Sequence, residues 1–190
     1  PAYTCKQFSS YDRGSTDPSV LTDMNWFANG DRGHHLRSEQ RNGQEEWVMM
    51  DAAGPGCIVR IWSANPKDAD LVRIYIDEAP EPVVEMPLVD LLGGANLPFI
   101  VPVVGEASRG WNCYLPIPYA KHCKVTASKP DFYYQVNYRT YAPGTALDRR
   151  GCGPPAGDHR PPAPRGRQYP PGHRGLPRRD VRGRGGLARS

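Results

Sequence analysis

Residues 56–77, with the sequence GCIVRIWSANPKDADLVRIYID, decide the fold. In two runs an apolar side chain recurs at every second position: Cys57, Val59 and Ile61 in the first, Val72, Ile74 and Ile76 in the second. Side chains alternate across a strand, so each run predicts a strand with one apolar and one mixed face. The turn signal 65–68, with the sequence NPKD, separates the two strands.

The same period of two extends outward from this stretch. It recurs at 122–127 and 132–139 and, less regularly, at 46–51 and 111–117. Glycine and proline turns separate the runs, and only 89–92 suggests a helical turn. Short strands about ten residues apart predict an all-β protein, an antiparallel jelly roll or β-sandwich. Residues 9–33 are polar and glycine-rich, and they predict a long loop ordered by aromatic side chains.

The charge of the chain is divided between two parts. Residues 148–190 hold 11 Arg, 3 Asp and no Lys or Glu, whereas residues 1–147 carry 13 basic and 17 acidic side chains. The tail has no Ile, Phe or Trp, so it cannot bury enough apolar surface to offset the entropy of ordering. We therefore predict a folded domain over 1–147 and a tail over 148–190 that is disordered or translated from a shifted reading frame. An authentic arginine-glycine tail that binds nucleic acid is the rival interpretation.

Known motifs narrow the function further. The dinucleotide fingerprint fails because Val59 stands where it needs glycine, and no apolar run is long enough to span a membrane. The five cysteines are widely spaced, and Cys57, Cys113 and Cys123 lie in apolar strand patterns that predict small buried thiols, with one disulfide left open. Adjacent His34 and His35 would point to opposite faces of a strand, so no metal or cofactor site is expected. The chain begins at Pro1, which suggests a fragment or a processed product from an unknown compartment.

Several motifs resemble those of one family in their sequence and in their order along the chain. They span residues 9–13, 25–27, 54–62, 104–106, 109–119, 121–124 and 134–141. They are similar to the amino-terminal half of the bacterial family once called domain of unknown function 2961, now glycoside hydrolase family 172. The resemblance implies two jelly rolls per intact chain, assembly as trimers or hexamers, and activity on α-linked fructofuranosides or arabinofuranosides. It also implies that the two catalytic glutamates lie downstream, so this chain would hold no catalytic residue and be inactive alone.

Three groups of residues are candidates for binding the sugar. The first is Asp12 and Arg13, for which a local ion pair is the alternative. The second is Asn25, Trp26 and Asp31, for which a self-packed loop is the alternative. The third is Glu106, Arg109 and Trp111, predicted on a loop between two strands, where a subunit contact or a purely structural loop would also fit. Arg60 beside Trp62 predicts packing with a cation–π contact, and 135–139 predicts a solvated strand face.

These observations leave two functions for the domain. It is either part of a furanoside-acting hydrolase or a non-catalytic module for carbohydrate binding or oligomer assembly. The expected partners are a carbohydrate and further copies of the chain. The acidic body argues against nucleic acid as a partner, and nothing suggests a membrane partner.

Overall fold

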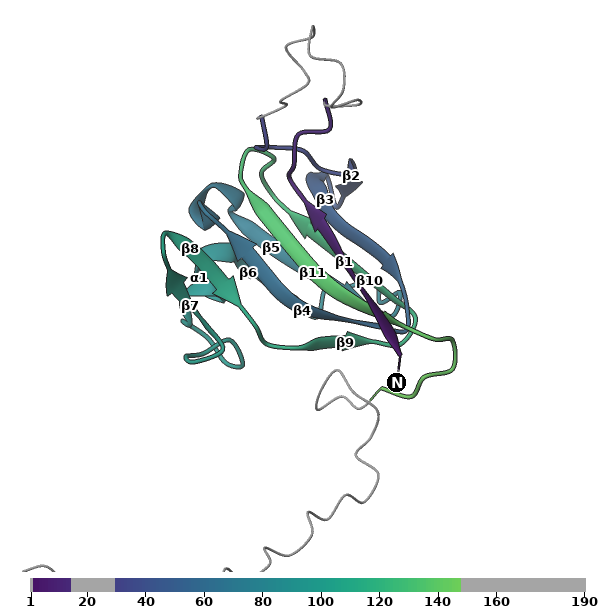
Figure 1. Cartoon of the computed structure of the whole chain (residues 1–190). Helices are drawn as coiled ribbons and strands as arrows, with labels where there is room; N and C mark the ends of the chain where they lie inside the picture. The colour runs from purple at the N-terminus through teal and green to yellow at the C-terminus, as the bar shows by residue number, and fades with distance from the viewer. Residues whose placement is uncertain (1, 15–29, 148–190) are drawn as a thin grey trace, which may run out of the picture. The chain divides into compact units, whose positions relative to one another are not determined.

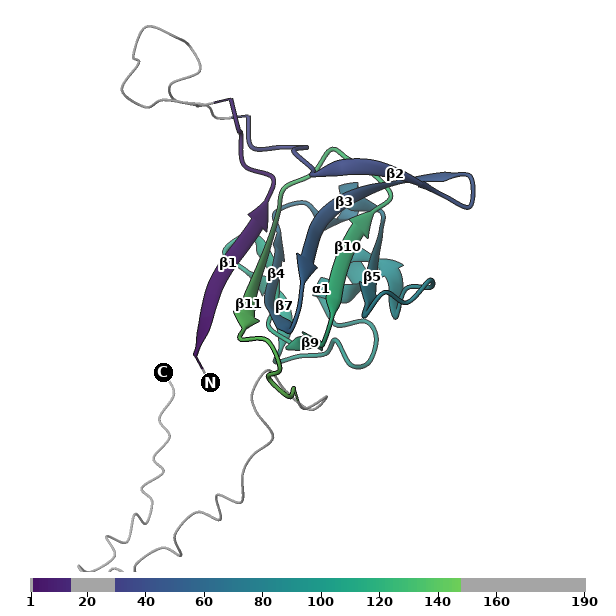
Figure 2. The ribbon, with the colours of Figure 1, turned by 90° about the vertical axis from the view of Figure 1, so that its right-hand side faces the viewer.

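The computed structural model describes residues 2–14 and 30–147, and their strands form two antiparallel sheets that face each other (Figures 1 and 2). The six-stranded sheet has the order β1-β11-β4-β8-β7, with β9 also paired to β4. Its strands are β1 (Tyr3–Ser9), β4 (Gly56–Ser63), β7 (Val104–Ala107), β8 (Gly110–Cys113), β9 (Ile117–Tyr119) and β11 (Tyr134–Tyr141). The predicted all-β sandwich of the jelly-roll class is confirmed.

The five-stranded sheet has the order β2-β3-β10-β5-β6. Its strands are β2 (Arg37–Arg41), β3 (Gln44–Ala53), β5 (Leu71–Ile76), β6 (Val84–Pro87) and β10 (His122–Ala127). Neighbours in this sheet come from distant parts of the chain, since β10 lies between β3 and β5. The fold therefore depends on long-range pairing between segments.

One apolar core fills the space between the sheets. On β10 and β11 the predicted inward residues are all part of it: Cys123, Val125, Ala127, Tyr134, Val136 and Tyr138. The helix α1 (Leu88–Gly93) adds three fully buried leucines to the core and ends at Gly94, which adopts a left-handed conformation. The helical turn predicted at 89–92 is thus confirmed, and its role is to cover the core.

A β-bulge in β4 corrects the predicted faces of that strand. Along β11, Tyr138 pairs with Ile58 and Asn137 pairs with Arg60, so Val59 has no partner. An unpaired extra residue reverses the alternation of faces. Ile58 and Ile61 therefore lie together in the core, whereas Val59 is only partly buried. The expected alignment of Cys57, Val59 and Ile61 on one face was wrong.

A second bulge changes β3 in the same way. Val125 pairs with Met50 and Thr126 pairs with Val48, which leaves Met49 unpaired. Met49 and Met50 both belong to the core. Glu46 pairs with Glu39 of β2 and lies on the outer face of the five-stranded sheet, with Tyr75 and Thr126. The bulge thus places the Glu46 carboxylate on the outer face, although Met49 and Met50 beside the bulge both lie in the core.

Two edge strands carry no alternating apolar pattern. β1 lies at the edge of the six-stranded sheet with most of its residues exposed, and β2 consists of charged and polar residues. Because burial on one face produces the alternation, exposed edge strands lack the signal on which the prediction rested.

The cysteines are divided between two states. Cys57 is disulfide-bonded, whereas Cys5, Cys113 and Cys123 are free. The interpretation of Cys113 and Cys123 as buried thiols is confirmed, and that of Cys57 is corrected. The tail predicted over 148–190 lies outside the described residues. No described helix is long and apolar enough to cross a membrane.

The bulge at Val59 can be tested by truncating neighbouring residues of β4. Ile58→Ala should lower the free energy of unfolding by about 2–4 kcal/mol, because Ile58 is fully buried between the sheets. Val59→Ala should cost less than about 1 kcal/mol, since that side chain is only partly buried. Denaturant unfolding measures both values. An equal loss for the two variants would contradict the bulged register.

Candidate functional site

The side chain of Asp12 bonds the backbone at both ends of residues 15–29, the segment that contains the predicted sugar-binding residues Asn25 and Trp26. Its carboxylate accepts hydrogen bonds from Gly14 N and Gly30 N, each at 2.8 Å. These N–H groups, Gly14 first, hold the pKa of Asp12 below its ordinary value. Asn25 and Trp26 belong to residues 15–29, which lie outside the described residues. The carboxylate thus links the two ends of that segment.

Asp31 and His34 complete this cluster, which we call the Asp12 clamp. The Asp12 N–H donates to Asp31 Oδ1 at 2.9 Å. His34 Nε2 donates to the Gly30 carbonyl at 2.9 Å and lies 3.9 Å from Asp12 Oδ1. Most carboxylate contacts in the clamp are to main-chain N–H groups, so the carboxylates order the backbone.

Arg13 is held by the main chain of the same segment. Its guanidinium donates to the carbonyls of Ser9 and Tyr11 at 3.0 and 3.2 Å and lies 4.2 Å from the centre of the Tyr11 ring. The local pair with Asp12, expected as the alternative, is therefore not formed. Tyr11 is 55% exposed, so an aromatic ring stands at the surface beside the clamp.

The third group of predicted residues lies on a β-hairpin. Glu106 of β7 pairs with Trp111 of β8, and the two strands are joined by Ser108 and Arg109, both with positive φ. Positive φ at both central residues is typical of a tight hairpin turn. The expected loop between two strands is thus a two-residue turn. Trp111 packs against the core, whereas Glu106 and Arg109 are exposed.

The register places the clamp and the hairpin at the same end of the six-stranded sheet. Trp111 pairs with Ser63, Ser63 pairs with Tyr134, and the N–H of Ser10 donates to the Tyr134 carbonyl. Adjacent strands lie about 4.8 Å apart, so the three steps between Trp111 and Ser10 span roughly 14 Å. The structure thus brings Asp12, Arg13 and Asp31 together and places Glu106, Arg109 and Trp111 apart from them.

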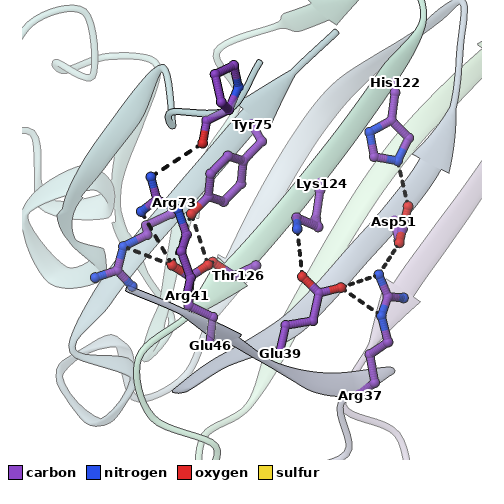
Figure 3. A network of polar contacts seen from close by, with 11 residues as sticks. Arg37, Glu39, Arg41, Glu46, Asp51, Arg73, Tyr75, His122, Lys124 and Thr126 are labelled. Atoms are coloured by element: carbon purple, nitrogen blue, oxygen red, sulfur yellow. Dashed lines mark hydrogen bonds and ion pairs between the residues drawn. The ribbon is translucent and has the colours of Figure 1, made fainter. Parts of the chain in front are cut away.

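A network of ion pairs, not expected from the sequence, covers the outer face of the five-stranded sheet (Figure 3). Arg37 bridges Glu39 and Asp51, Lys124 Nζ donates to Glu39 Oε2 at 2.6 Å, and His122 Nε2 lies 2.6 Å from Asp51 Oδ1. The residues come from β2, β3 and β10. Arg37–Asp51 and His122–Asp51 pair opposite charges between neighbouring strands, and Lys124 reaches across β3 to Glu39 on β2.

Glu46 is the buried centre of the same network. Its side chain is 3% exposed and accepts hydrogen bonds from the hydroxyls of Tyr75 and Thr126 at 2.7–3.0 Å. Arg41 and Arg73 lie 3.7 and 3.5 Å away. Burial is the main cause and the contact with Glu46 the second cause that raise the pKa of Tyr75 well above its ordinary value. Tyr75 therefore stays a neutral hydrogen-bond donor.

Three described carboxylates, Asp12, Glu39 and Asp51, have contacts that favour the ionised form. Hydrogen bonding from Lys124 lowers the pKa of Glu39, with Arg37 adding to it. Burial disfavours ionisation of Asp51, but hydrogen bonds from Arg37 and His122 outweigh it and lower the pKa. A glycosidase needs one carboxylic acid that stays protonated beside an ionised one. Asp12, Glu39 and Asp51 all shift in the opposite direction.

The opposite end of the sandwich carries an apolar groove of about 550 Å³. It lies beside β9, whose Tyr119 pairs with Gly56 at the start of β4, far from Ser63 at the clamp end. Among the residues that line or adjoin the groove, Val83 is 57% and Leu97 is 78% exposed. Within 2–14 and 30–147, no cluster of three His, Cys, Asp or Glu side chains could hold a metal ion.

Comparison with known proteins adds one finding. A family model described as "GH172 first beta-sandwich domain" matches residues 1–149. No curated protein sequence matches the chain.

The Glu46 centre can be tested against a neighbour on the same strand. Glu46→Ala should lower the free energy of unfolding by roughly 3 kcal/mol, because it leaves the buried hydroxyls of Tyr75 and Thr126 without their shared acceptor and removes the ion pair with buried Arg73. Glu45→Ala should change it by less than about 0.5 kcal/mol, since Glu45 is exposed. Denaturant unfolding at neutral pH compares the two. Equal, small effects would contradict a buried ionic centre.

Proposed function

Because the chain belongs to glycoside hydrolase family 172 as its first β-sandwich domain, we propose that it serves a hydrolase of α-linked furanosides. The substrates are fructofuranosides or arabinofuranosides. In this proposal the domain binds and orients the sugar, and the two catalytic carboxyl groups lie outside it. The chain alone is then inactive.

The ionised state of the carboxylates is the single observation that supports a domain that binds the sugar without cleaving it. Retaining glycosidases place a nucleophile and an acid about 5–5.5 Å apart, and inverting enzymes place an acid and a base farther apart. Glu39 and Asp51 do share a partner, Arg37. That guanidinium stabilises both charges and keeps both groups ionised, so neither can donate a proton to the glycosidic oxygen.

The Asp12 clamp supports a binding role. Asp12 fixes both ends of residues 15–29, and that segment contains Asn25 and Trp26. An indole ring can stack on the C–H face of a sugar, and an amide can both donate to and accept from hydroxyls. We propose that Asp12, Arg13 and Asp31 hold this segment in place while Asn25 and Trp26 contact the furanoside.

Assembly is the second candidate function, favoured by the apolar groove. Exposed apolar patches of this kind mark protein–protein contacts. We propose that the intact protein forms a homo-oligomer, a trimer or hexamer, and that the groove with Val83 and Leu97 contributes to its contacts. Carbohydrate and further copies of the chain are then the partners.

The division of labour predicts binding without turnover. An aryl α-arabinofuranoside should raise the melting temperature of the chain and release no phenol. At ten times the dissociation constant the stabilisation is about 1.4 kcal/mol. Asp12→Asn should reduce the shift in melting temperature, because the amide cannot accept hydrogen bonds from both Gly14 and Gly30. Differential scanning calorimetry and phenol release measure the two effects.

Glu106→Gln serves as the control, since Glu106 lies on the hairpin apart from the clamp. Phenol release by the purified chain that disappears in Glu106→Gln would place a catalytic carboxylate in this domain and refute the proposal. A matched aryl pyranoside that shifts the melting temperature equally would refute the furanoside preference.

The assembly candidate predicts association through the groove. The chain should sediment faster than a monomer at high concentration, and the double variant Val83→Asp with Leu97→Asp should sediment as a monomer. Leu36→Asp is the matched control, because Leu36 is also exposed but lies before β2, away from the groove. Sedimentation velocity measures the difference. A wild-type chain that is monomeric at every concentration would exclude this role.

A further inference from the structure

The outer face of the six-stranded sheet carries amide and aromatic side chains where its counterpart carries ion pairs. Asn112, Trp62 and Gln135 are register partners across β8, β4 and β11, so their side chains share one face. The next row along places Arg60 beside Asn137. The bulge at Val59 puts Arg60 and Trp62 on this outer face, since it turns Ile58 and Ile61 inward.

Arg60 ties these rows together. Its guanidinium donates to the side-chain oxygens of Asn112, Gln135 and Asn137 at 3.1, 2.7 and 3.2 Å. Asn137 in turn donates to Gln7 Oε1 at 2.8 Å on β1. The amide oxygens therefore point toward Arg60. No described acceptor bonds the Gln135 amide nitrogen, which is left for a ligand.

Trp62 lies beside this array because position 110 has no side chain. A Cβ atom at Gly110 would come within 2.3 Å of the indole nitrogen of Trp62. The N–H edge of the ring therefore occupies the space of the missing side chain. The guanidinium of Arg60 lies 5.9 Å from the ring centre, and the ring is only partly buried. A partly exposed indole is thus held in a fixed place on the sheet.

Tyr114 adds a second aromatic ring. Its hydroxyl donates to Asn112 Oδ1 at 3.3 Å, and its side chain is 55% exposed. Asn112 thus contacts Tyr114 on one side and Arg60 on the other. We call the set Arg60, Trp62, Asn112, Tyr114, Gln135 and Asn137 the polar platform.

We propose that the polar platform binds a neutral oligosaccharide, at a site separate from the Asp12 clamp. The inference rests on the proposed function only in taking the ligand to be a furanose chain. Indole and phenol rings stack on the C–H faces of sugars, and amides donate and accept hydrogen bonds as sugar hydroxyls require. The platform then holds the chain of a longer substrate.

The charge of the platform identifies its occupant. It contains no carboxylate, and three amide oxygens already occupy its one cation. Polyanions such as nucleic acids need several available cations, and the platform has none to spare. Arg139, farther along the same face, lies over the ring of Tyr3. The opposite sheet shows what a merely solvated outer face looks like in this molecule, with Arg37, Glu39 and Lys124 paired to one another. A ligand that is neutral and rich in hydroxyls fits the platform.

The test measures binding of α-1,5-linked arabinopentaose to the full chain by isothermal titration calorimetry. Trp62→Ala and Gly110→Ala should each weaken binding at least tenfold, the first by removing the ring and the second by displacing it. Tyr3→Ala is the matched control and should change affinity less than twofold, because Tyr3 is an exposed aromatic residue at the far end of the same sheet. Thermal unfolding of each variant verifies that it folds.

The outcomes separate this inference from the proposed function. Both platform variants should keep the melting-temperature shift caused by the aryl α-furanoside, which depends on Asp12. Wild-type affinity in both variants, or no binding of the pentaose to a chain that still responds to the aryl furanoside, would overturn the platform alone. A change in sedimentation on Trp62→Ala without a change in glycan affinity would also overturn it, and would assign this face to a second copy.

Discussion

The register of β4 determines the chemistry of both faces of the larger sheet. The extra residue at Val59 turns Ile58 and Ile61 into the core and leaves Arg60 and Trp62 outside. With regular alternation, Ile58 would stand with Arg60 and Trp62 on the outer face. Arg60 pairs with Asn137 and Trp62 pairs with Gln135 on the carboxyl-terminal side of this unpaired residue, and the bulge keeps Ile58 off the outer face beside them. Bulges often redirect side chains in this way at functional positions.

The sequence predicted strands where one face is buried and failed where burial does not produce alternation. The apolar residues of β5, β10 and β11 alternate cleanly, and their inward faces were assigned correctly. β1 and β2 are exposed edges, and the bulges at Val59 and Met49 depend on partner strands far away in the chain. Of the candidate site, Asp12, Arg13 and Asp31 were predicted as binding residues in two separate groups, and the contact between Asp12 and Asp31 was not predicted, because it joins positions 19 residues apart. The ion pairs of Asp51 with Arg37 and His122 could not be predicted, because they join residues from three strands whose pairing the local pattern does not specify.

The proposal that this domain binds rather than cleaves its sugar rests on the contacts of its carboxylates. Those of the clamp accept hydrogen bonds chiefly from main-chain N–H groups, and those of the outer network accept them from arginine, lysine, histidine, tyrosine or threonine. For Asp12, Glu39 and Asp51 these contacts lower the pKa and stabilise the ionised carboxylate. A general acid requires the reverse environment, apolar or beside another negative charge. The contacts that pair the strands of the five-stranded sheet and join the segment ends therefore disfavour the protonated form of Asp12, Glu39 and Asp51 that a general acid would need.

The two outer faces and the two ends of the sandwich thus differ in the kind of side chain that each exposes. On the five-stranded sheet the outer charged residues form ion pairs across β2, β3 and β10. Few hydrogen-bonding groups of these side chains therefore remain for a ligand. On the six-stranded sheet the partners of Arg60 are neutral amides, which leaves the Gln135 amide nitrogen, the exposed Tyr114 ring and the partly buried Trp62 ring for a ligand. The apolar groove lies at the end away from the clamp. A sugar bound at the clamp end and a protein contact at the groove end would not compete for space, so one small domain can serve recognition and assembly together.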